Sequence, residues 1–149
     1  MGKGQKIAVI TLVVILIAAI IVAVAMKKQP GIKQAAKVKV TNAPAGQVIG
    51  GFPTELLIDA SGSADQSYAA AYNNANQYTV KVKSASSEQK VFTDYLAYFN
   101  ANGYKIVNKN QTDTISNIYA TKGTITVNVV ITHLKVDNNQ TFINITYVK

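Results

Sequence analysis

Residues that could carry out catalysis are few and scattered along this chain. There is no Cys among the 149 residues, which excludes thiol catalysis, disulfides and cysteine-ligated zinc. The one histidine, His133, has no Gly-x-Ser-x-Gly motif elsewhere with which to activate a serine. Glu55 and Asp59 have the i, i+4 spacing of neighbours on a helix face, and no other acidic pair stands out. We therefore predict that the chain has no catalytic residue, no metal site and no cofactor.

Binding motifs for ions and phosphates are equally sparse. Asp137-Asn138-Asn139 offers oxygens of the kind that calcium prefers, but three such residues in a row are typical of a hairpin turn. The sequence contains no phosphate-binding loop, no Gly-x-Gly-x-x-Gly and no EF-hand spacing. The sequence thus predicts a protein that is not an enzyme.

The positive charge is concentrated near the N-terminus. All 15 basic residues are Lys, and the net charge is +8. Seven of these lysines lie in the first 40 residues, which contain no acid, and the remaining 109 residues are nearly neutral. The rest of the chain therefore lacks the basic face and the arginines with which proteins contact nucleic acids. We predict no nucleic-acid partner.

Residues 7–26 form an apolar stretch in which Thr11 is the one polar residue. As a helix this stretch would be about 30 Å long, the thickness of the hydrocarbon core of a membrane. We therefore predict a transmembrane anchor over 1–28, a Lys-rich linker over 29–52 and a folded domain over 53–149. The alternative is a cleaved signal peptide, for which Ala23-Val24-Ala25 provides a small-x-small cleavage pattern.

The side of the membrane on which the domain would lie is open to two interpretations. Lysines are more numerous after the apolar stretch than before it, and the positive-inside rule then favours a cytoplasmic domain. In contrast, a nearly neutral domain rich in Thr, Asn and Ser and without Cys is typical of envelope proteins. We predict a single-pass membrane protein whose domain is extracytoplasmic.

The clearest element of the domain is a helix over 87–102. Ser86 and Gln89 have the spacing of a capping box at its start, and Asn102-Gly103 is a typical helix end. Between them an apolar stripe has helical spacing, formed by Val91, Phe92, Tyr95, Leu96 and Phe99. This stripe predicts one helix packed on a core.

The remainder of the domain is predicted to be β-structure. Alternating apolar and polar residues predict strands at 77–83, 104–109, 114–121, 124–132 and 141–147. The segment 68–72 is ambiguous between helix and strand, and 55–59 is either a short strand or one helical turn. The predicted fold class is α+β, with a small antiparallel sheet of four to six strands packed against one main α-helix after the transmembrane helix.

Eight tyrosines are more than a small core needs. Exposed tyrosines are common in interfaces because they combine a large apolar ring with a polar hydroxyl. Four of them lie off the predicted core positions and form a candidate interaction surface, namely Tyr98, Tyr119, Tyr68 and Tyr72. The alternative is that they are amphipathic residues at the rim of the core.

Two resemblances bear on the function. The order of Phe52-Pro53, Tyr78-Thr79-Val80, Ser86-Ser87, Tyr95 and Gly103-Tyr104, followed by strands to Val148, resembles a group of bacterial single-span membrane-anchored envelope proteins without an assigned activity. Lys3-Gly4-Gln5 before the apolar stretch resembles the processing site of archaeal pilins and archaellins, which implies cleavage after Gly4. The first resemblance implies an anchored domain, and the second implies a filament subunit.

We predict from these observations a membrane-anchored, non-enzymatic envelope protein whose α+β domain binds a protein or a surface polymer. The alternative prediction is a pilin-like filament subunit that is processed after Gly4.

Overall fold

The structure is a computed structural model that describes residues 38–134 and 140–149. No helix within these ranges is long and apolar enough to cross a membrane. The apolar stretch 7–26 and the processing sites beside it lie outside the described residues. The predicted fold class and the predicted class of single-pass, anchored proteins are therefore corrected, because both required a transmembrane helix that the described structure does not contain.

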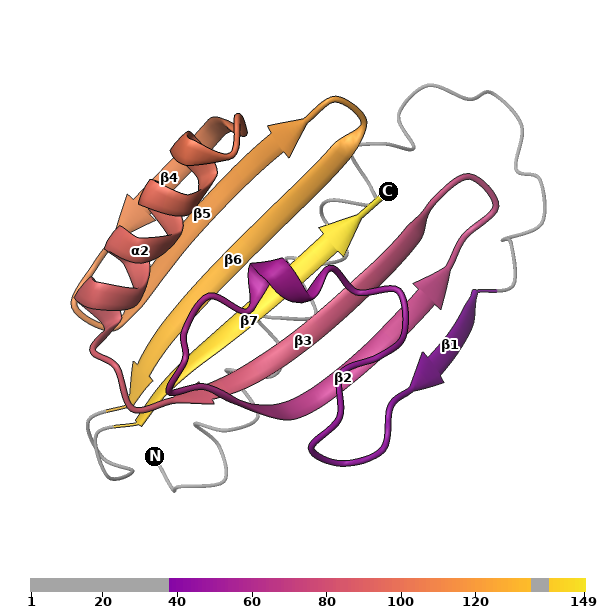
Figure 1. Cartoon of the computed structure of the whole chain (residues 1–149), viewed down its shortest axis with the longest axis horizontal. Helices are drawn as coiled ribbons and strands as arrows, with labels where there is room; N and C mark the ends of the chain where they lie inside the picture. The colour runs from indigo at the N-terminus through magenta and orange to yellow at the C-terminus, as the bar shows by residue number, and fades with distance from the viewer. Residues whose placement is uncertain (1–37, 135–139) are drawn as a thin grey trace, which may run out of the picture. The chain divides into compact units, whose positions relative to one another are not determined.

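The described chain forms a sheet of seven antiparallel strands in the order β1-β2-β3-β7-β6-β5-β4 (Figure 1). The strands are β1 (Lys39–Asn42), β2 (Ser63–Ala71), β3 (Asn76–Ser84), β4 (Lys105–Gln111), β5 (Ile115–Lys122), β6 (Ile125–Leu134) and β7 (Gln140–Val148). The predicted number of four to six strands is thus wrong. The seventh strand, β1, was missed because all four of its residues are exposed and carry no apolar alternation.

The strand register places one row of apolar residues across the centre of the sheet. Val80 pairs with Ile145, Ile145 with Val129, and Val129 with Ile118. All four side chains are fully buried. The alternation predicted for β3, β6 and β7 is therefore confirmed, because alternate residues of a strand lie on one face of the sheet.

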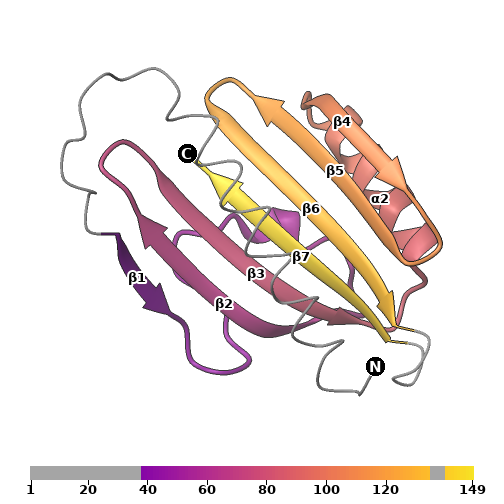
Figure 2. The ribbon, with the colours of Figure 1, turned by 180° about the vertical axis from the view of Figure 1, so that it is seen from behind.

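Helix α2 (Glu88–Ala101) packs over β4, β5 and β6 on the apolar face of the sheet (Figures 1 and 2). It buries four residues of the predicted stripe, with Leu96 partly exposed at its edge. The predicted capping box is wrong by one residue. Ser87 is the N-cap and its hydroxyl accepts a hydrogen bond from the Lys90 amide, whereas the Ser86 hydroxyl donates to Asp59.

The other half of the apolar face is covered by the segment between β1 and β2 (Figure 1). This segment contains a single turn of 3₁₀-helix, η1 (Thr54–Leu56), and its Phe52 and Leu56 side chains are buried in the core. The region 29–52, predicted as a linker, thus includes both β1 and a core residue. The two coverings, α2 and the η1 segment, enclose a cavity between them above the sheet.

Candidate ligand-binding cavity

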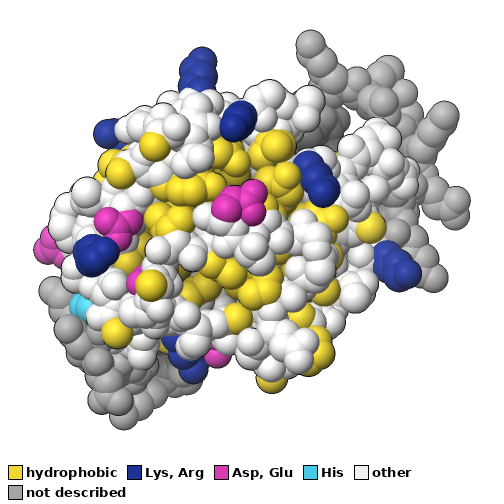
Figure 3. All heavy atoms as spheres, in the orientation of Figure 1, with side chains coloured by type: hydrophobic (Ala, Val, Ile, Leu, Met, Phe, Trp, Pro, Cys, Tyr) yellow, Lys and Arg dark blue, Asp and Glu magenta, His cyan; other side chains and the backbone are white. Residues whose placement is uncertain are grey.

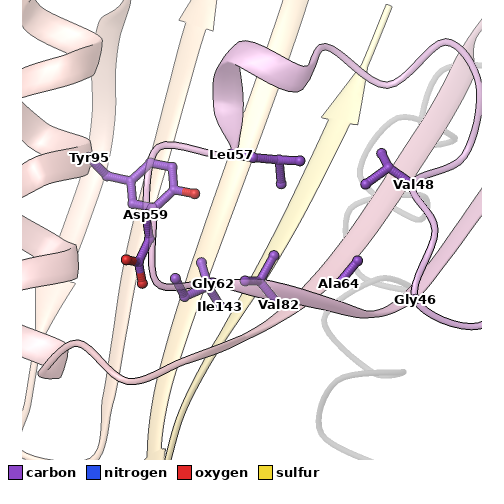
Figure 4. Close-up of a pocket in the computed structure, with 9 residues that line it drawn as sticks. All are labelled: Gly46, Val48, Leu57, Asp59, Gly62, Ala64, Val82, Tyr95 and Ile143. Carbon is purple, nitrogen blue, oxygen red and sulfur yellow. The ribbon is translucent and has the colours of Figure 1, made fainter.

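A cavity of about 240 Å³ lies where the η1 segment, the sheet and α2 meet (Figure 4). The η1 segment contributes Val48 and Leu57, the sheet contributes Val82 and Ile143, and α2 contributes Tyr95. The complete lining is Gly46, Val48, Leu57, Asp59, Gly62, Ala64, Val82, Tyr95 and Ile143. In the space-filling view, hydrophobic side chains are visible across the middle of this face of the molecule (Figure 3).

The lining residues are distributed unevenly along the cavity. Asp59 and Tyr95 lie together at one end, and Gly46, Val48 and Ala64 lie at the other (Figure 4). The cavity therefore has a polar end and an apolar end. Such an arrangement suits a molecule whose polar group and apolar part are separate, because each part then meets a matching wall.

The carboxylate of Asp59 is held by three serines from two segments. Oδ1 accepts hydrogen bonds from the Ser61 amide at 3.0 Å, the Ser61 hydroxyl at 2.8 Å and the Ser86 hydroxyl at 3.2 Å. Oδ2 accepts a hydrogen bond from the Ser84 hydroxyl. Partial burial would raise the pKa of Asp59, but these hydrogen bonds outweigh it and hold the pKa below its ordinary value. Asp59 is therefore charged at neutral pH.

Tyr95 fixes the η1 segment to the helix. Its side chain is 1% exposed, and its hydroxyl donates a 2.8 Å hydrogen bond to the carbonyl of Leu56. Burial raises the pKa of the Tyr95 phenol, which therefore stays neutral and keeps its proton for this bond. Because Leu56 is fully buried, the bond also satisfies a carbonyl that water does not reach.

The wall of the cavity is closely packed at Gly62. A Cβ atom at this position would meet Val82 Cγ1 at 2.5 Å and the Asp59 carbonyl oxygen at 3.0 Å. The Gly62 amide donates a 3.0 Å hydrogen bond to the Asp59 carbonyl and so closes a turn. Because Gly62 has no side chain, this turn lies directly on β3. Close approach of this kind is a use of glycine that no other residue replaces.

A family model described as START domain-like matches residues 60–141, more than half of the chain. The chain belongs to the START domain-like family. The match begins beside Asp59 and covers β2, β3, α2, β4, β5 and β6. No curated protein and no solved structure matches the chain. The comparisons contain nothing on envelope proteins or on pilin leaders, so both predicted resemblances stay predictions.

The START domain-like region has a second, more open hollow of about 460 Å³ at the start of α2, and its lining includes Glu88, Asp113 and His133. Glu88 accepts a hydrogen bond from Ser116, and His133 Nδ1 lies 3.1 Å from the Thr141 hydroxyl. His133 thus lies at the rim of the apolar face, as its position in β6 predicted. Within the described residues, no three His, Cys, Asp or Glu side chains are grouped to hold a metal ion.

The four tyrosines of the candidate interaction surface do not come together in the START domain-like domain. Tyr68 and Tyr119 lie in one row on the face of the sheet opposite α2, but three strands separate them. Tyr98 is on α2, where its ring contacts Phe99 and Tyr104, and Tyr72 is exposed at the end of β2. Tyr68 and Tyr119 thus share a face of the sheet but lie far apart on it, and Tyr98 lies on α2, over the other face.

The cavity was not predicted from the sequence, because its walls come from several separate segments that share no repeating pattern of apolar residues. Asp59-Ala60-Ser61-Gly62 has the composition of a turn in which the aspartate binds a nearby amide, and this signal was available. Its connection to Ser84 and Ser86, about 25 residues later, follows from the strand register alone.

Proposed function

We propose that the domain is a non-enzymatic binding module that holds a small, mostly apolar molecule in the cavity between α2 and the η1 segment. The observation that carries the proposal is a cavity of about 240 Å³ with seven apolar or glycine residues beyond its polar end and the sheet as its floor. Membership of the START domain-like family is compatible with ligand binding. Large mostly apolar pockets with a few polar groups are the usual form of small-molecule sites.

The volume limits the size of the ligand. An apolar cavity of about 150 Å³ binds benzene, and sites for drug-sized molecules begin at about 300 Å³. A cavity of about 240 Å³ lies between these sizes. The ligand that it encloses therefore has roughly eight to twelve non-hydrogen atoms within the cavity, by interpolation between those cases.

The test is to fill the cavity from its apolar end. Ala64→Leu places three more carbon atoms into the space between Gly46 and Val82. We expect the full-length protein to lose binding of the neutral fluorescent probe naphthalene, which is within this size range, by about tenfold or more. The matched control is Ala71→Leu, the same change at an exposed position of the same strand. Fluorescence titration measures both variants beside the unchanged protein.

Equal probe binding by the two variants would contradict the proposal, provided that both have the circular dichroism spectrum of the unchanged protein. Loss in Ala64→Leu alone would support it. Binding of a protein or a surface polymer, processing after Gly4 and the absence of enzymatic activity stay predictions, and the probe experiment does not depend on them.

A further inference from the structure

Asp59 is the one charged residue that lines the cavity, and its described hydrogen-bond partners are all neutral. Its charge acts on Lys90 through space, and that lysine is paired with Asp94. Two other aspartates, in contrast, form ion pairs with lysines. Asp65 pairs with Lys81 and Lys83, and Asp94 pairs with Lys90. Among the described residues, no lysine forms an ion pair with Asp59. The polar end of the cavity therefore carries a negative charge that the described part of the protein does not balance with a direct contact.

We propose that the ligand of this cavity is a primary amine with an apolar chain or ring, whose ammonium group binds at Asp59 while its apolar part extends toward Val48 and Ala64. This inference rests on the proposed function, since it names the class of molecule that the same cavity takes.

The hydrogen-bond pattern favours a donor over an acceptor. Ser61, Ser84 and Ser86 each donate a hydroxyl proton to the carboxylate of Asp59. A ligand that approaches this cluster therefore meets oxygen lone pairs, which accept hydrogen bonds. Oδ2 of Asp59 accepts one described hydrogen bond, whereas Oδ1 accepts three. The cluster thus presents acceptors, and an ammonium group, which has three N–H donors and no acceptor, is complementary to it.

Charge excludes the opposite class of ligand. A carboxylate or phosphate group at this end would face the Asp59 charge across a mostly apolar cavity, where repulsion is stronger than in water. An alcohol would offer the carboxylate a single O–H donor, without the positive charge and the three N–H donors of an ammonium group. Amines are therefore favoured over alcohols, and alcohols over acids, for the same apolar chain.

The experiment compares three eight-carbon ligands as competitors of naphthalene on the full-length protein at pH 7. We expect n-octylammonium to displace the probe at a concentration about tenfold lower than 1-octanol, and octanoate to displace it more weakly than either. Asp59→Asn should remove the tenfold preference for the amine and leave the affinity for octanol within about twofold.

Glu55→Gln is the matched control, because it removes one negative charge from an exposed position of the η1 turn that does not line the cavity. It should leave the preference for the amine unchanged. Octyltrimethylammonium, which has the charge but no N–H donor, separates charge from hydrogen bonding in the unchanged protein and should bind more weakly than n-octylammonium.

Two failures are distinguishable. Equal displacement by amine, alcohol and acid, in a protein whose probe binding is lost in Ala64→Leu, would overturn the amine assignment and leave the proposed function standing. Probe binding that is the same in Ala64→Leu and Ala71→Leu would overturn the proposed function itself. If Asp59→Asn does not fold, the ligand series on the unchanged protein decides the assignment alone.

Discussion

Tyr95 connects parts of the domain that are distant in sequence. Its ring is part of the core under α2 and contacts Phe99, its hydroxyl binds the η1 segment through Leu56, and one of its edges forms the cavity wall. A buried phenol of this kind combines apolar packing with a satisfied polar group. Tyr95 is therefore one of the contacts that hold the covering segment over the cavity.

Tyr95→Phe keeps the ring and removes the hydroxyl, so the buried Leu56 carbonyl loses its side-chain donor. We expect the free energy of unfolding to fall by about 1–3 kcal/mol, the cost of leaving a buried polar group unsatisfied. Urea denaturation measures the change. Tyr98→Phe, which removes a hydroxyl from a partly exposed neighbour on the same helix, is the control and should change stability by less than about 0.5 kcal/mol. Equal losses in the two variants would contradict the role assigned to Tyr95.

Asp59 predicts a defined dependence of stability on pH. Its pKa in the folded protein is below the ordinary value, so its hydrogen bonds contribute fully above about pH 4 and are lost as the pH falls through the lowered pKa. The difference in unfolding free energy between the unchanged protein and Asp59→Asn should therefore be constant from about pH 5 to 7 and shrink below about pH 4. Denaturation curves at a series of pH values test this, and a difference that grows toward acid would contradict it. Asp65, whose pKa is also lowered, is present in both proteins and cancels.

At the scale of elements, the start of α2 shows how adjacent serines take different roles. Ser87 caps the helix, while Ser86 donates to Asp59 and its amide donates to the Ser84 hydroxyl at 2.9 Å. The helix start is thus attached to the polar end of the cavity by the residue directly before its cap. Substitution of Ser87 should therefore affect the helix, and substitution of Ser86 should affect the contact with Asp59.

Ser87→Ala removes the cap, and we expect it to lower the free energy of unfolding by about 1 kcal/mol, whereas Ser87→Gly should cost only a few tenths. Ser86→Ala should leave the helix intact and remove one of the hydrogen bonds to Asp59. Thermal unfolding by circular dichroism compares the three variants. A larger loss of helix signal in Ser86→Ala than in Ser87→Ala would instead support the capping box predicted from the sequence.

The sequence predicted those elements in which a single physical pattern dominates. The stripe of α2 and the alternation of β3, β6 and β7 are buried as expected, and Gly103, at a φ of +72°, ends the helix region. The segment 68–72 of β2 was ambiguous because its three consecutive alanines suit a helix whereas the flanking tyrosines suit a strand, and the partner strands on both sides decide its structure. β1 carries almost no side-chain signal, so its pairing with β2 was not foreseen.

The candidate site was less predictable than the fold. The four tyrosines were selected for exposure, and the structure separates them because the position of each depends on its strand or helix face. Asp59 was noted for its spacing to Glu55, yet its neighbours in space are serines from the end of β3. Contacts between distant segments determine the cavity, and a single sequence does not contain the register that creates them.

For the whole molecule, the sheet order implies a gradient of stability from centre to edge. β7 lies between β3 and β6, and each of its residues is buried or partly buried, whereas β1 pairs with β2 alone and has four exposed residues. Edge segments with few buried contacts open locally at a lower free energy than the global unfolding reaction. The apolar face under α2 and the η1 segment should therefore stay closed while the edge opens.

Hydrogen exchange of backbone amides tests this gradient. We expect amides of β3, β6 and β7 to exchange at rates that correspond to global unfolding, and those of β1 to exchange at least about tenfold faster under the same native conditions. β4, the other edge strand, is the internal comparison. Protection of β1 equal to that of β7 would show that the edge strand is not a separate unit.

The central place of β7 also has a consequence for biosynthesis. It is the last strand of the sheet in chain order, and it alone joins the hairpin partners β1, β2 and β3 to β6, β5 and β4. While the ribosome is still translating β7, both halves present unpaired inner edges, one along β3 and one along β6. Open strand edges promote association with other chains. The sheet is therefore completed only once β7 has emerged from the ribosome, and the nascent chain is most dependent on chaperones just before that point.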